Sequence, residues 1–176
     1  HTEKEAEVTE ALMGRLNSAS VYLDNITNDG ILTPIEKEQL FEIYRNIAKE
    51  YEATRSNAYN YRIWKYKVDG VTEEAGINGG EGRYESYVAF KNAYDSIATA
   101  FGSNIWGFTK MNETTALPDG YSTTLLKEYL DAYYEAHGTL TESFSAITAA
   151  IEAAQKAAEA TLKELTDNLL PEEMST

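Results

Sequence analysis

One apolar stripe constrains this chain more than any other feature. Starting near Leu125, apolar side chains recur every three or four residues, as they do along one face of an α-helix. The stripe holds its phase through Tyr129, Tyr133, Ala136, Leu140, Phe144, Ile147, Ile151, Ala154, Ala158, Leu162 and Leu165. At a rise of about 1.5 Å per residue, a helix of ~40 residues is ~60 Å long. The sequence therefore predicts a long C-terminal helix.

Gly138 is the one position that argues against continuity of this helix. A glycine after His137 could end one helix, and Thr139 with Glu142 three residues later could cap the next. Because the stripe passes Gly138 without a shift, we expect one continuous helix that accepts the ~1 kcal/mol cost of an internal glycine. A kink at Gly138 is the alternative.

Helical periodicity also marks three earlier segments. They run from Val8 to Ile26, from about Pro34 to about Lys65, and from Tyr87 to Phe101. The predicted fold class is all-α, an elongated antiparallel four-helix bundle with long inter-helix loops. We expect one domain over residues 1–176, with a core at about 8–165 and a polar tail at 171–176.

Two long connections separate the predicted helices. Residues 68–82 read VDGVTEEAGINGGEG, a glycine-rich and acidic stretch that predicts a flexible, exposed loop. Residues 102–120 instead contain a cluster that includes Trp106 and Phe108, which is too apolar to be left in water. This cluster either folds back against one end of the bundle or forms an exposed patch for a partner.

The segment NITNDGILTPIE, residues 25–36, matches the spacing of a calcium-binding EF-hand loop. In that interpretation the metal ligands are Asn25, Thr27, Asp29 and Glu36. Only two of these four side chains are charged, and a proline occupies the tenth position of the loop. A divalent cation would be poorly compensated there.

A turn followed by a capped helix explains the same residues without a metal. Asp29 and Gly30 form a strong turn dipeptide. Thr33 suits the N-cap, Pro34 the first helical position, and Glu36 the third position of a capping box. Because this reading also explains the proline, we expect a structural corner with no metal and no cofactor; calcium is the alternative.

Charge and composition exclude several functions. The chain has 15 basic and 29 acidic residues, a net charge of -14, which disfavours binding to nucleic acid or to an anionic membrane. No apolar run approaches the ~18 residues of a membrane span, and the first ten residues do not resemble a secretion signal. The chain has no cysteine, and His137 is its only internal histidine, which we expect on a helix surface. We therefore expect no enzyme.

The segment from Asp24 to Lys37, together with the helix that follows it, resembles helical segments of phage and prophage tail proteins of the tail-tip, minor structural and host-specificity class. The resemblance covers about residues 24–154 and is specific only between Asp29 and Lys37. It implies a non-enzymatic structural or spacer module of a tail fibre, tail-tip or host-specificity protein in the virion tail. Its partners would be neighbouring domains or subunits, with a homotrimer in the parent protein. It implies no catalytic residues.

Two other functions stay open at this point. A calcium-stabilised module would use the ligands named above. A surface-exposed helical adhesin would bind its partner through the patch of Trp106 and Phe108.

Overall fold

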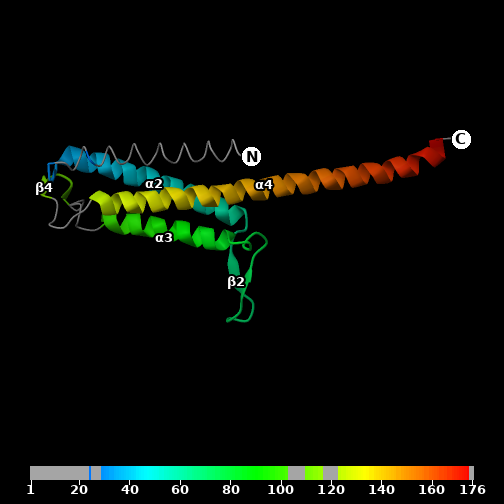
Figure 1. Ribbon diagram of the computed structural model, residues 1–176, viewed down its shortest axis with the longest axis horizontal. Coiled ribbons are helices and arrows are strands. Elements are labelled where there is room, and N and C mark those ends of the chain that lie inside the picture. Colours follow the sequence, from blue (N-terminus) through cyan, green and yellow to red (C-terminus); the bar gives the residue numbers. More distant parts are fainter. Residues whose placement is uncertain (1–23, 25–28, 103–109, 117–122, 175–176) are drawn as a thin grey trace. The chain divides into compact units, whose positions relative to one another are not determined.

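The computed structural model describes Asp24 and residues 29–102, 110–116 and 123–174 (Figure 1). Helices dominate it, and short strands lie at the chain reversals. The elements in chain order are β1 (Ile31–Leu32), α2 (Pro34–Asn60), β2 (Lys65–Lys67), β3 (Glu73–Ala75), α3 (Arg83–Gly102), β4 (Thr115–Ala116) and α4 (Thr123–Met174).

The predicted four-helix, all-α fold needs correction. The described residues contain three long helices, and short strands form two antiparallel two-stranded sheets, β1 with β4 and β2 with β3. Except for Asp24, the predicted first helix lies outside the described residues. The fold is mostly helical. The strands escaped prediction because two or three residues are too few to show an alternating pattern.

The chain divides into two compact units, His1–Thr141 and Glu142–Thr176. In the first unit, α2, α3 and the start of α4 lie side by side (Figure 1) around an aromatic core. Tyr51 stacks on Tyr94 with ring centroids 3.8 Å apart and on Phe90 at 5.2 Å, and Phe90 packs against Tyr133 at 5.3 Å. These rings supply much of the apolar area that holds the three helices together.

The connection after α2 is structured, contrary to the flexible loop that its composition predicts. Helix α2 ends at Asn60, and β2 pairs with β3 so that Tyr66 lies opposite Glu74. The Asp69 carboxylate closes the hairpin turn, because it accepts hydrogen bonds from the amides of Val71 at 2.9 Å and Thr72 at 2.6 Å. These bonds to the charged form also lower the pKa of Asp69.

The second connection returns to the corner before α2. Ile31 pairs with Ala116 and Leu32 with Thr115, so β4 lies beside β1. The predicted patch residues Trp106 and Phe108 lie outside the described residues.

Helix α4 passes through Gly138 without a break, so the continuous helix is confirmed. Its buried side chains end at Ile147, and every residue from 149 to 169 is exposed. The core therefore stops well before residue 165. An apolar stripe identifies the apolar face of a helix, but it does not tell whether another element covers that face. Within the described residues, no helix is both long and apolar enough to cross a membrane.

Candidate functional site

The corner before α2 is built by local hydrogen bonds. Thr33 is the N-cap: its hydroxyl accepts from the Glu36 amide at 3.3 Å, and Glu36 Oε1 accepts from the Thr33 amide at 3.0 Å. Pro34 occupies the first turn, where its missing N–H costs nothing. Asp29 Oδ1 accepts from the Ile31 amide at 3.2 Å, and Gly30 takes a φ of +75°.

This geometry engages one oxygen of each of the two carboxylates that a calcium ion would need. Asn25 and Thr27 lie outside the described residues, whereas Asp29 and Glu36 each accept a hydrogen bond from the backbone of the corner. In the part of the chain that the structure describes, no group of three or more His, Asp or Glu side chains could hold a metal ion. A metal at this corner would compete with these backbone hydrogen bonds for the same two carboxylates.

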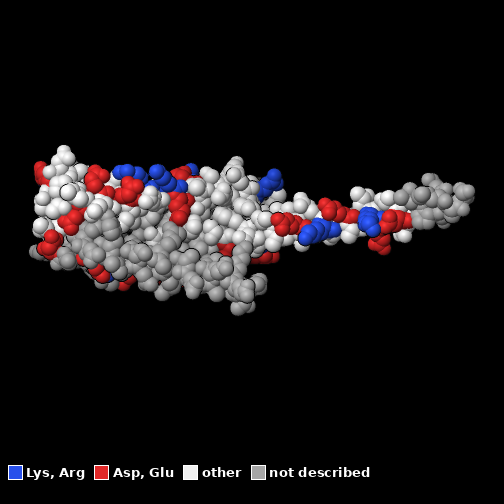
Figure 2. All heavy atoms as spheres, turned by 90° about the horizontal axis from the view of Figure 1, so that it is seen from above, with Lys and Arg blue, Asp and Glu red and all other residues white. Residues whose placement is uncertain are grey.

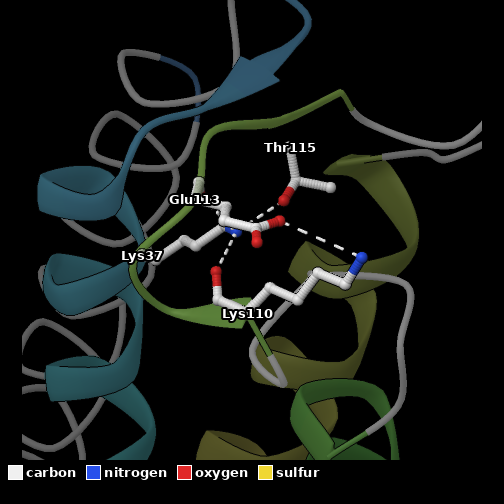
Figure 3. Close-up of polar contacts among 4 residues, drawn as sticks. All are labelled: Lys37, Lys110, Glu113 and Thr115. Atoms are coloured by element: carbon white, nitrogen blue, oxygen red, sulfur yellow. Dashed lines mark hydrogen bonds and ion pairs between the residues drawn. The ribbon is translucent and has the colours of Figure 1, made fainter.

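A buried lysine joins this corner to the second connection (Figure 3). Lys37 is fully buried, and its ammonium donates to the carbonyl of Lys110 at 2.8 Å, the carbonyl of Glu113 at 2.7 Å and the hydroxyl of Thr115. Three donors thus meet three oxygens, which is the full capacity of an ammonium group. We call this arrangement the Lys37 latch.

The Lys37 latch was not predicted, although one signal for it existed. Lys37 lies three residues before Leu40 and ten before Ile47, so it occupies the apolar face of α2, where a charged side chain needs an internal partner. Its acceptors are mostly main-chain carbonyls, which any sequence supplies. The sequence could therefore flag the lysine but not its partners.

A cleft of about 640 Å³ lies where α2 ends and α3 begins. Four aromatic side chains face it, and a guanidinium, a hydroxyl and an amide from the last two turns of α2 supply its polar groups. Its lining is Arg55, Ser56, Ala58, Tyr59, Asn60, Ile63, Trp64, Tyr84 and Tyr87. We call it the aromatic cleft.

The electrostatics around the aromatic cleft are balanced. Arg55 lies 3.6 Å from the carboxylate of Glu52. Beside the cleft, Lys65 donates to Glu85 at 2.8 Å; this hydrogen bond lowers the pKa of Glu85 and raises that of Lys65. Desolvation by burial raises the pKa of Tyr87 above that of a free tyrosine.

His137 is not the surface residue that the sequence predicts. Its side chain is 18% exposed, its Nε2 lies 3.8 Å from Glu50 Oε1, and its ring packs against Phe90 at 5.8 Å. The buried Tyr133 hydroxyl donates to the same Glu50 oxygen at 3.0 Å. This group ties α2 to α4 inside the bundle, so its evident role is to hold helices together.

Comparisons with known proteins add no relative to this description. No protein-family model matches the chain, and neither a curated protein nor a solved structure is similar enough to count as a match. Function must therefore be argued from the corner, the cleft and the helices themselves.

Proposed function

We propose that this chain is a non-enzymatic structural module that joins and spaces neighbouring parts of a phage or prophage tail protein. The observation that carries this proposal is the apolar stripe on the exposed part of α4. Covering the apolar stripe of an amphipathic helix lowers the free energy by roughly 25 cal/mol per Å² of apolar surface removed from water. A module with such a helix is suited to be joined to another helix.

The stripe is substantial. Leu162 is 65% exposed and Leu169 is 74% exposed, and both belong to one face. Its members follow each other at intervals of 3, 4, 4, 3 and 4 residues: Ile151, Ala154, Ala158, Leu162, Leu165 and Leu169. The 18-residue step from Ile151 to Leu169 covers five turns at about 3.6 residues per turn, so the stripe runs parallel to the axis of a nearly straight helix.

The charges of this segment favour several copies of the same helix as its covering. The charged residues between 149 and 169 are Glu152, Lys156, Glu159, Lys163, Glu164 and Asp167. At ~100° per residue they leave an uncharged arc of ~220° centred on the stripe. In Figure 2 acidic and basic groups follow one another along this part of α4. A neutral arc this wide exceeds the seam of a two-stranded pair, so we propose a homotrimer.

The corner supports a mechanical role. The capping box sets where α2 starts, and the Lys37 latch fixes the chain reversal at which β1 meets β4. In this role the lengths of the helices set the distance between the neighbouring parts, and the corners set the direction in which the chain continues. The assignment to a tail rests on the resemblance between Asp29 and Lys37, and detection of the chain in the tails of purified particles tests it separately.

Self-association of the full chain tests the structural role. Light scattering coupled to gel filtration should give a trimer whose fraction rises with concentration. Replacing both Leu162 and Leu165 with Glu should give a monomer. The unit His1–Thr141 should stay folded in this variant, as judged by an unchanged first melting transition in far-UV circular dichroism. The matched control is Ala160→Glu, which adds a charge on the opposite face and should leave the trimer intact.

Two outcomes contradict the proposal. A monomer at every concentration would show that copies of this chain do not cover the stripe. Equal loss of association in the Ala160→Glu control would place the contact on another face of α4.

A further inference from the structure

We propose that the aromatic cleft binds a neutral saccharide, with a sugar ring against the rings of Trp64 and Tyr59 and its hydroxyls bonded to the polar groups of α2. This goes beyond the structural role, because it assigns a ligand to a site that spacing and joining do not need. It stands on the chemistry of the lining residues alone.

The lining combines the two kinds of surface that a sugar presents. A sugar ring has faces of C–H groups, which the electron-rich face of an aromatic ring attracts, and a rim of hydroxyls. Tyr59 and Trp64 lie with ring centroids 5.3 Å apart, and Tyr84 and Tyr87 are at 6.4 Å. Tyr59 is 70% exposed, so most of its ring surface stays open to a ligand beside its contact with Trp64.

The polar groups come from the end of one helix. Arg55, Ser56 and Asn60 belong to the last two turns of α2, and all three line the cleft. A guanidinium and an amide are planar and can each bond two neighbouring hydroxyls. A purely apolar ligand would remove water from these groups without replacing their hydrogen bonds, which disfavours its binding.

Charge selects a neutral ligand over an anionic one. Among the described residues of the lining, Arg55 is the ionised one, and Glu52 lies 3.6 Å from it. The whole chain carries a net charge of -14, which repels anions at long range. A carboxylated or phosphorylated ligand would meet a compensated guanidinium inside a negative field.

The cleft is formed in advance of binding. Its floor is the buried pair Ala58 and Ile63. Trp64 is held by Gly76 on the neighbouring strand end. The Trp64 carbonyl accepts a hydrogen bond from the Gly76 amide at 2.8 Å, and the indole packs so closely on Gly76 that an added Cβ would clash with its nitrogen. A wall that cannot move loses little entropy when the ligand binds.

Fluorescence of Trp64 gives a direct test in the full chain. The sequence has two tryptophans, so Trp106→Phe leaves Trp64 as the single reporter. This variant is first applied to an array of neutral and acidic glycans, and the strongest neutral trisaccharide is then titrated against Trp64 emission. We expect saturable quenching with a Kd of about 0.1–1 mM, the range of a small, solvent-open site.

Variants assign the binding to the cleft. Tyr59→Ala and Asn60→Ala should each weaken the neutral glycan at least tenfold without changing the melting temperature, since both side chains are exposed. The matched control is Tyr66→Ala, which removes an exposed tyrosine of β2 outside the cleft and should leave affinity unchanged. Binding of no neutral glycan, a preference for acidic glycans, or full affinity in Tyr59→Ala would each overturn the proposal.

Discussion

At the scale of single residues, Lys37 shows how a charged side chain can serve a core. Burying an ammonium is costly unless its donors are satisfied, and here two carbonyls and a hydroxyl satisfy them. The same bonds satisfy the main-chain oxygens of Lys110 and Glu113. The residue thus stabilises both the start of α2 and a connection that has little regular structure of its own.

Removing the ammonium should therefore destabilise the first unit. Lys37→Met keeps most of the side-chain volume but leaves its acceptors without donors, and we expect a loss of about 2–3 kcal/mol in the free energy of unfolding. Urea denaturation followed by circular dichroism measures it. Lys49→Met is the control, because Lys49 is exposed on the same helix and its replacement should cost less than ~0.5 kcal/mol. Equal effects of the two changes would show that the latch contributes nothing.

Residue 138 offers the opposite kind of change. Gly138 lies inside α4 with helical backbone, and an added Cβ would meet no atom within 4 Å. Gly138→Ala should stabilise by ~1 kcal/mol, since alanine loses less backbone entropy in a helix. That gain raises the melting temperature by about 2–4 °C in a chain of this size, which calorimetry resolves. A lower melting temperature would indicate that the helix bends at this glycine in solution.

At the scale of elements, the start of α2 is the clearest case of local encoding. The residues from Asp29 to Glu36 make a turn, a cap and a first helical turn with bonds that span two or three positions. Neighbours in sequence carry such bonds, so the pattern can be recognised without the fold. The β2–β3 hairpin is a contrast, since its strands pair across a turn whose composition suggested flexibility.

Calcium should not stabilise this corner. Because Glu36 already accepts the Thr33 amide, binding a metal would exchange one set of bonds for another. We expect the same melting temperature in chelator and in millimolar calcium, whereas a ligand at a hundred times its Kd would add ~2.7 kcal/mol. A rise of several degrees that Glu36→Gln removes would instead establish a metal site formed with Asn25 and Thr27.

At the scale of the whole molecule, the sequence by itself determined helices α2, α3 and α4, the cap of α2 and the continuity of α4, because these depend on contacts between residues three or four positions apart. The tertiary structure decided the rest. It partly buried His137, paired β1 with β4, ended the core at Ile147 and closed the Lys37 latch. The aromatic cleft belongs to this second group, since its rings come from both sides of a hairpin. Periodicity records which face of a helix is apolar, but only the folded chain settles which distant residues cover that face and which leave it open.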